Sequence, residues 1–313
     1  MSISLCSTSV ANTGGIKCDV APGIPVALLV WNDTEAISAI SGSQFQPYME
    51  AASKKSKSDS GKLFVFPIIQ DITDKTESNK EGSLNQGFKT VLLEGKPAYD
   101  FKVFAGQSQV PQLRKFNNQS LNTLILDNHN RIWGVKSGEN FKGAQAKIFT
   151  GGLKFATGQN VEEGVVSISL SYLVASELND DAAFGEVEST AGIVGLLDAN
   201  LTYVSNVSNV FKIDVAIPTS KIGNAISLYA EKSTQLANAA LWVAKTGATF
   251  STALAITSVA VDPALSCWTV TFDSAAYTAL ASGAKIQLTL ADPTTLDAAD
   301  VDEIEGVPVI LTK

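Results

Sequence analysis

The sequence predicts a mainly β protein with a few short helices, organised as two domains of residues 1–189 and 190–313. Short apolar segments recur along the chain with turn residues between them, and several alternate apolar and polar residues. A length of 313 residues is too great for one ordinary domain. A hydrophobic content of 45% with 17% charged residues supports sizeable cores and excludes a disordered chain.

Seven strands are expected in the first domain, and Val165–Val174 is the clearest. Its apolar residues share one face, and Ser167, Ser169 and Ser171 share the other. This serine face suits contact with another subunit, the lining of a passage, or a solvated outer surface. The apolar positions are Val166, Ile168, Leu170, Tyr172 and Val174, and the other six strands are Pro25–Trp31, Leu63–Gln70, Phe88–Glu94, Tyr99–Ala105, Leu121–Leu126 and Arg131–Lys136.

A hairpin turn and two helices interrupt these strands. Asp127–Asn130 reads as a turn, because Asp and Asn tolerate left-handed conformations and bond to their own backbone. Asp33–Ser41 begins with residues that can cap a helix. Pro111–Asn117 has Pro at a plausible first position, with Leu113 and Phe116 spaced to pack on a sheet.

Two polar loops separate strands of the first domain. Glu50–Gly61 is rich in Lys and Ser. Asp71–Gly87 is a longer polar excursion between apolar strands, and a loop of more than about 12 residues in a compact domain is usually functional or disordered. This segment is therefore either a hairpin arm that reaches a neighbouring subunit or an ordinary flexible surface loop.

The second domain follows an acidic, small-residue stretch at Asn179–Gly195, which has the composition of an interdomain connection. Residues 190–313 carry a net charge of −5, and residues 1–189 carry −3. Eight short strands separated by turn residues favour an antiparallel sandwich. They are Ala199–Val204, Val210–Ile217, Ala225–Lys232, Leu241–Lys245, Ala255–Val261, Cys267–Asp273, Ala284–Leu290 and Val307–Leu311.

Two helices are expected near the end of the chain. Ser274–Ser282 has Ser274 as a candidate N-cap and Gly283 as a stop. Asp292–Glu305 resembles a calcium loop in composition only, since the Asp-x-Asp-x-Asp-Gly spacing is missing. An acidic solvated helix capped by Thr294 or Thr295 fits this segment better.

The sequence offers little catalytic chemistry, and no catalytic, cofactor-binding or metal-binding residue is assigned. His129 is the only histidine and lies in the predicted turn, where we expect it to be exposed. Phosphate-binding loops, dinucleotide fingerprints and nucleophile elbows are missing. Carboxylate pairs for glycoside hydrolysis need only be close in space, but nothing in the sequence selects a pair. We therefore expect a protein that is not an enzyme and has no cofactor.

Charge and cysteine content narrow the possible partners. The net charge of −8 and the presence of only two arginines, Arg114 and Arg131, disfavour ordinary nucleic-acid binding. The apolar run Ile24–Trp31 is too short to cross a bilayer and fits a buried strand. Residues 1–10 show no secretory signal. A Cys6–Cys18 disulfide is possible, but reduced thiols, Cys267 included, fit cytoplasmic synthesis better.

A family resemblance lies between Leu121 and Val174. The segments LNTLILDNHNRIWGVK, FTGGLKFATGQN and VVSISLSYLV, with IKCDVAPGIPVALLVW near the beginning, resemble tail proteins of tailed phages that infect Bacteroidetes-type bacteria. The tube-like part covers roughly residues 16–175. The C-terminal half resembles the Ig-like domains found on many phage structural proteins.

This resemblance implies a phage tail-tube (major tail) protein located in the virion tail and made in the bacterial cytoplasm. Such subunits form hexameric rings whose sheets join into an inner β-barrel, which removes exposed strand edges. Stacked rings give a tube through which DNA passes without specific binding, and other tail proteins are further partners. Val165–Val174 would be a barrel strand, Asp71–Gly87 the arm between rings, and the Ig-like domain an outward decoration. No membrane partner is implied.

Other classes of protein remain open at the level of sequence. One is another virion component, such as a head decoration or fibre protein, or the tube of a bacterial injection system. A second is a carbohydrate-binding or adhesive module, and a third is an enzyme without recognised motifs. Self-assembly into rings separates the tube from the other classes.

Overall fold

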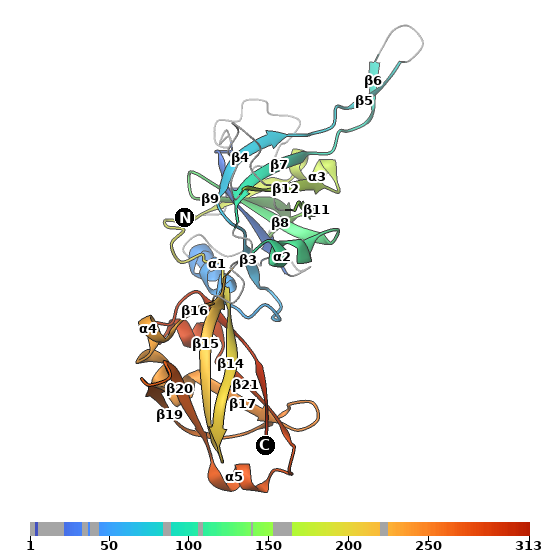
Figure 1. Ribbon diagram of the computed structural model, residues 1–313. Helices are drawn as coiled ribbons and strands as arrows, with labels where there is room; N and C mark the ends of the chain where they lie inside the picture. Colours follow the sequence, from blue (N-terminus) through green and yellow to red (C-terminus); the bar gives the residue numbers. More distant parts are fainter. Residues whose placement is uncertain are drawn as a thin grey trace, which may run out of the picture. The chain divides into compact units, whose positions relative to one another are not determined.

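The computed structural model describes residues 4–5, 22–32, 37, 44–83, 89–105, 109–138, 140–152, 165–219 and 225–313. The chain folds as two compact units (Figure 1). The first unit holds Met1–Ser53 and Lys57–Gly195, and the second holds Lys54–Ser56 and Leu196–Lys313. Both units are mainly β, as the sequence predicts, with short helices between the strands. The identification of these units with tail-tube-like and Ig-like folds stays a prediction.

The first unit is built on an antiparallel sheet in which β8 is shared by two branches. The first residues of β8 pair with β11, its last residues pair with β9, and β2 pairs along β8 as well. The order continues from β11 through β12 and β7 to β4, and from β9 through β13 to β1. The strands are β1 (Ser4–Leu5), β2 (Pro25–Trp31), β3 (Leu63–Val65), β4 (Ile69–Asp74), β5 (Lys80–Ser83), β6 (Lys89–Leu93), β7 (Ala98–Phe104), β8 (Ser120–Asp127), β9 (Arg131–Ser137), β10 (Asn140–Lys142), β11 (Ala144–Thr150), β12 (Val165–Tyr172) and β13 (Ala182–Glu186).

The strand β2 separates two hydrophobic cores, which explains its unbroken apolar sequence. Leu28 and Val30 point into one core, and Leu29 and Trp31 point into the other. Successive side chains of a strand face opposite ways, so a strand buried on both sides needs apolar residues at every position. The prediction of a buried strand over this run is confirmed.

The strand β12 has the predicted alternation. Val166, Ile168, Leu170 and Tyr172 are buried, whereas the serines between them are partly or fully exposed. The predicted C-terminal end of this strand, Val174, is wrong. Val174 is 41% exposed and lies at the N-cap of α3 (Ala175–Asp180). The strand stops after Tyr172 because the chain turns there into a helix.

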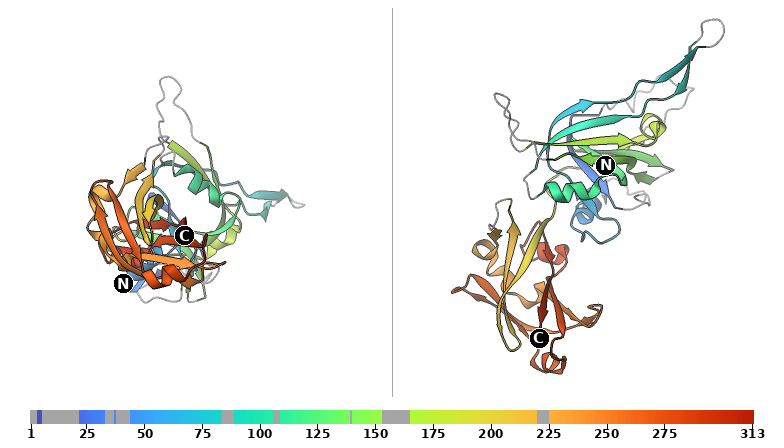
Figure 2. Two further views of the ribbon diagram at one scale, coloured as in Figure 1. Left: turned by 60° about the horizontal axis from the view of Figure 1, so that its bottom comes forward. Right: turned by 45° about the vertical axis from the view of Figure 1, so that its right-hand side comes forward.

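A two-stranded hairpin, β5–β6, extends away from the rest of the first unit (Figures 1 and 2). We call residues 75–97, which carry this hairpin, the arm. The described part of the long segment predicted between apolar strands is therefore structured, and its limits differ from the expected Asp71–Gly87. Asp71–Asp74 belongs to β4, and the arm runs on through β6. The expected strand Leu63–Gln70 is two strands, β3 and β4, interrupted around Pro67.

The helices of the first unit agree only in part with the sequence prediction. Helix α2 (Val110–Leu113) and the 3-10 turn η2 (Arg114–Phe116) lie where Pro111–Asn117 was expected to be helical. Helix α1 (Phe45–Ser53) was not expected, and its last turn occupies the start of the predicted loop Glu50–Gly61. The expected helix Asp33–Ser41 lies outside the described residues except for Ile37, which bridges to Phe141.

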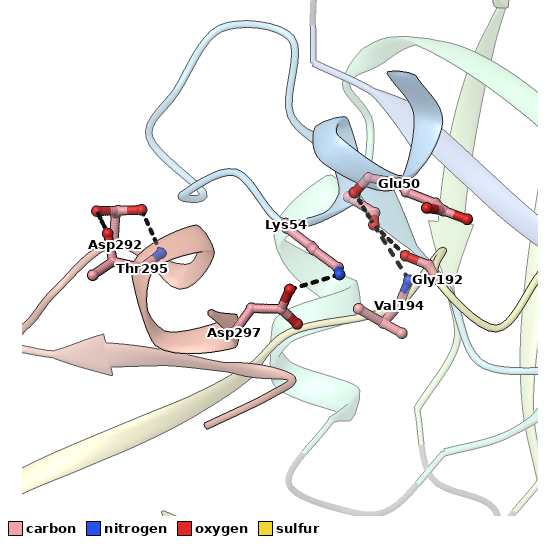
Figure 3. Close-up of polar contacts among 8 residues, drawn as sticks. Glu50, Lys54, Gly192, Val194, Asp292, Thr295 and Asp297 are labelled. Atoms are coloured by element: carbon pink, nitrogen blue, oxygen red, sulfur yellow. Dashed lines mark hydrogen bonds and ion pairs between the residues drawn. The ribbon is translucent and has the colours of Figure 1, made fainter. Parts of the chain in front are cut away.

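The predicted interdomain connection Asn179–Gly195 is largely part of the first unit. Strand β13 lies within it and pairs with β9, and Phe184 is buried. Beyond β13, Ile193 joins a core that includes residues of α1. The backbone N–H of Val194 donates to Ser53 Oγ at 3.3 Å (Figure 3). The segment is acidic and rich in small residues, but pairing and burial make it structural.

The second unit is a sandwich of two sheets, in agreement with the predicted architecture. One sheet has the order β19-β20-β15-β14-β22 with β16 beside β15, and the other has β18-β17-β21-β23. Only β14 and β22 pair in parallel among its described strands. Trp268, Phe211 and Phe272 are the largest fully buried side chains in the core between the sheets. The elements are β14 (Leu197–Val207), β15 (Val210–Pro218), β16 (Ala225–Ser227), α4 (Tyr229–Lys232), η3 (Gln235–Ala237), η4 (Ala239–Leu241), β17 (Trp242–Thr246), β18 (Thr252–Ala253), β19 (Ile256–Asp262), β20 (Cys267–Phe272), α5 (Ser274–Ala279), β21 (Lys285–Leu290), α6 (Pro293–Asp297), β22 (Ile304–Val307) and β23 (Val309–Thr312).

Two expected elements of the second unit are corrected. The strand expected over Ala225–Lys232 ends at Ser227 and is followed by α4. The acidic helix expected over Asp292–Glu305 is only the short α6, and its cap is Asp292, which accepts the N–H of Thr295 at 3.0 Å (Figure 3). Ile304 and Glu305 belong to β22, because pairing with β14 stabilises an extended backbone there.

Both ends of helix α5 differ from the prediction. The cap of α5 is Asp273, whose side chain accepts the N–H of Ala276, and not the expected Ser274. The helix ends at Ala279 with Leu280 at its C-cap, so Gly283, with a φ of +78°, lies beyond the helix and does not stop it.

Candidate assembly surface

The outward face of β4, β7, β12 and β11 forms a continuous polar surface, which we call the open face. Three rows of paired residues cross it. In the first row, Ser167 pairs with Lys102, which pairs with Asp71. The remaining pairs add Thr73, Asp100, Ser169 and Phe149 in the second row, and Ala98, Ser171 and Lys147 in the third.

Two aromatic side chains stand out among the polar residues of this side of the sheet. Phe149 on β11 is 52% exposed and Phe104 at the end of β7 is 56% exposed. The opposite side of the same strands is mainly apolar, with Phe101, Val103 and Ile148 buried in the core. The sheet is thus anchored by one face, and its other face presents small, polar and aromatic groups.

The charges on the open face balance. Asp71 and Asp100 are matched by Lys102 and Lys147. Lys102 Nζ lies 3.4 Å from Asp71 Oδ2, and both side chains are well exposed, so this ion pair adds little stability. A face without net charge neither attracts nor strongly repels a polyanion.

Hydrogen bonds join the two strands of the arm at its base, and apolar side chains are exposed farther out. At its base, the N–H of Glu77 donates to the carbonyl of Lys96, and the N–H of Gly95 donates to Asn79 Oδ1 at 2.7 Å. Farther out, Val91 and Leu93 on β6 are each 52% exposed. Leu93 pairs with Lys80 and Val91 pairs with Glu81, with a register shift between the two pairs. These two side chains are the exposed apolar part of the arm.

The turn between β8 and β9 is organised by a buried carboxylate, Asp127. One carboxylate oxygen accepts the backbone N–H groups of His129 and Arg131 at 2.8 and 3.0 Å. The other accepts the N–H of Gly23 at 3.0 Å and the indole N–H of Trp133 at 2.8 Å. Burial pushes the pKa of Asp127 upward, but these four hydrogen bonds outweigh burial and hold the pKa below its ordinary value.

The geometry around His129 fits a structural turn. Its side chain is exposed, as expected, and its backbone N–H donates to Asp127 Oδ1. Among the described residues, no group of three or more His, Cys, Asp or Glu side chains could hold a metal ion. The described helices include none that is long and apolar enough to cross a membrane. Cys267 is a buried free thiol, whereas Cys6 and Cys18 lie outside the described residues.

Sequence reasoning missed part of this surface. The strand β11 was not predicted, although Ala144, Ala146 and Ile148 alternate with polar positions. Phe149 lies at one of the polar, outward-facing positions of that alternation. A period of two beginning at Ala144 would therefore have predicted an aromatic residue on the exposed face. The bonds from His129 and Arg131 to Asp127 fit the predicted turn, whereas the bond from Gly23 had no sequence signal, because Gly23 is distant in the chain.

No protein-family model matches the sequence, and no curated protein matches it.

Proposed function

We propose that this chain is a self-assembling structural subunit, a phage tail-tube protein whose stacked rings form the conduit for DNA. The observation that carries this proposal is the arm. An isolated two-stranded hairpin is marginally stable in water, and this one also exposes Val91 and Leu93. Contact with a second copy would cover these side chains and hold the hairpin in place.

The open face supports the same proposal. Hexameric rings are expected from the resemblance to tail tubes, with the sheets of neighbouring copies joined at their edges. A lumen lined by Ser167, Ser169 and Ser171 and by balanced charges would let DNA slide without gripping it. The net charge of −8 on the whole chain favours the same outcome. The second unit, proposed to be Ig-like, would lie on the outside of such a tube.

The test replaces the arm and leaves the sheet intact. Residues 78–95 are exchanged for Asn-Gly, which forms a two-residue hairpin turn between Glu77 and Lys96. Asp71–Asp74 is retained because it pairs with β7. We expect the intact chain to form rings and tubes in negative-stain electron microscopy, and the variant to fold but form no stacked tubes.

Thermal unfolding and circular dichroism provide the folding control for this variant. A folded variant that still forms tubes of normal length would refute the role of the arm in stacking. An intact chain that forms no rings at high concentration would refute the proposed function itself.

A further inference from the structure

Strand β19 is a long edge strand of the second unit with little of the usual protection against pairing. It has seven residues and is the outermost strand of its sheet. The other described strands that end a sheet or flank it are shorter, with two residues in β18, three in β16 and four each in β22 and β23. Natural edge strands usually carry charges, proline or bulges, because their free backbone groups can pair with another chain.

The outer part of β19 is regular and almost uncharged. A bulge disturbs it between Ile256 and Ser258, but Ser258–Asp262 pairs regularly with β20. Ser258 and Ala260 are exposed, and Val261 is 41% exposed. The single charge, Asp262, is bound to Lys212 at 2.6 Å within the same sheet. Ser258–Asp262 is therefore a regular strand edge whose one charge is paired, and it leaves the apolar side chain of Val261 partly exposed.

We propose that β19 pairs antiparallel with β19 of a second copy, with Ala260 of both copies on the two-fold axis. This register uses all five regular residues. It places Val259 opposite Val261 of the second copy on one face, which covers the exposed valine. On the other face it places Ser258 opposite Asp262, so a hydroxyl group can donate to a carboxylate.

The neighbouring registers, with the axis at Val259 or Val261, keep only three of the five regular residues in the pairing. Registers shifted by two residues are less favourable as well. Moving the axis to Asp262 sets two carboxylates against each other, and like charges directly opposite destabilise a sheet. Moving the axis to Ser258 brings the bulge into the pairing. The strand is therefore self-complementary around Ala260, as an isologous contact between two copies requires.

This pairing goes beyond the proposed tube and does not depend on it. Copies within one polar tube are related by rotation about its axis and translation along it, without two-fold axes between them. Pairing through β19 would therefore join free chains or separate tubes. A failure of ring formation would leave the test below unaffected.

The test is oxidative cross-linking of the full-length chain with single cysteines. In the proposed register, residue 260 faces itself, whereas residue 258 lies about 13 Å from its copy along the strands. We expect Ala260→Cys to form disulfide-linked dimers at least about tenfold faster than Ser258→Cys, because pairing raises the effective concentration of the facing thiols. Ala279→Cys, an exposed site on α5, gives the rate of random collision with the same native cysteines present.

A second variant tests the pairing without an added thiol. Ala260→Lys places two ammonium groups opposite each other, so the dimer seen by sedimentation should be lost, whereas Ala279→Lys should retain it. Equal cross-linking rates at positions 260, 258 and 279 would overturn the proposal. A fastest rate at position 258 would overturn the register.

Discussion

Asp127 accepts four hydrogen bonds at the end of β8, and its donors belong to three separate parts of the first unit. Gly23 leads into β2, His129 belongs to the following turn, and Arg131 and Trp133 lie in β9. The carboxylate thus fixes the start of β2 against the β8–β9 turn. A second contact reinforces it, since Asn128 Oδ1 accepts the N–H of Ile24 at 2.9 Å.

Replacing Asp127 by asparagine should therefore destabilise the first unit. The amide presents an NH₂ group to two N–H donors, so we expect a loss of about 1–3 kcal/mol in the free energy of unfolding at pH 7. Urea unfolding of the two proteins measures this difference. A loss below about 0.5 kcal/mol would mean that the four hydrogen bonds contribute little.

The effect should also depend on pH. Because the folded state lowers the pKa of Asp127, its stabilisation is present above the ordinary value of 3.8 and is lost as the pH falls through the lower folded value. The difference between the parent and Asp127→Asn should therefore shrink in acid. A difference that is constant from pH 7 to about pH 2 would contradict the assignment of this carboxylate.

At the scale of elements, strands were predicted well where the sequence was either apolar throughout or strictly alternating between apolar and polar residues. The buried strand β2 and the alternating strand β12 are confirmed because burial of apolar side chains decides both. Helix α1 was missed, since its buried residues Phe45, Met49 and Ala52 stand among polar residues in a segment that reads as a loop. Ile304 was assigned to a helix because its pairing partner in β14 is distant in sequence.

The open face was only partly predictable for the same reason. The serines of β12 were identified from one strand, but their neighbours on β7 and β11 depend on the register between strands. Sequence patterns give the faces of single strands and do not give which strands lie side by side. The exposed phenylalanines at 104 and 149 therefore emerged only from the assembled sheet.

The segment after β13 decides where the first unit can be cut. Ile193 is buried in a core of the first unit, and Val194 is bonded to Ser53 on α1. A chain ending at residue 189 lacks both contacts, whereas a chain ending at 195 keeps them. We expect the shorter fragment to be less stable by about 2–4 kcal/mol, the usual cost of removing a large buried aliphatic side chain.

Urea unfolding of the two fragments measures this cost. The point variant Ile193→Ala in the longer fragment serves as a matched control, since it should reproduce most of the loss. Equal stability of the two fragments would show that residues 190–195 contribute nothing to the first unit.

On the scale of the whole molecule, the two units carry different features that bear on the proposed assembly. The first unit carries the arm, the open face and the branched sheet. The second carries a well-packed sandwich core and the net charge of −5 assigned to residues 190–313. We therefore propose that the first unit forms the tube and that the second unit makes contacts on the outside of it.

The mass of the purified full-length chain in solution, measured across a range of concentrations, tests self-assembly most directly. We predict discrete ring-sized oligomers that grow into longer assemblies as the concentration rises, because contact with a second copy covers the arm. A monomer of 32.9 kDa at every concentration would contradict the account.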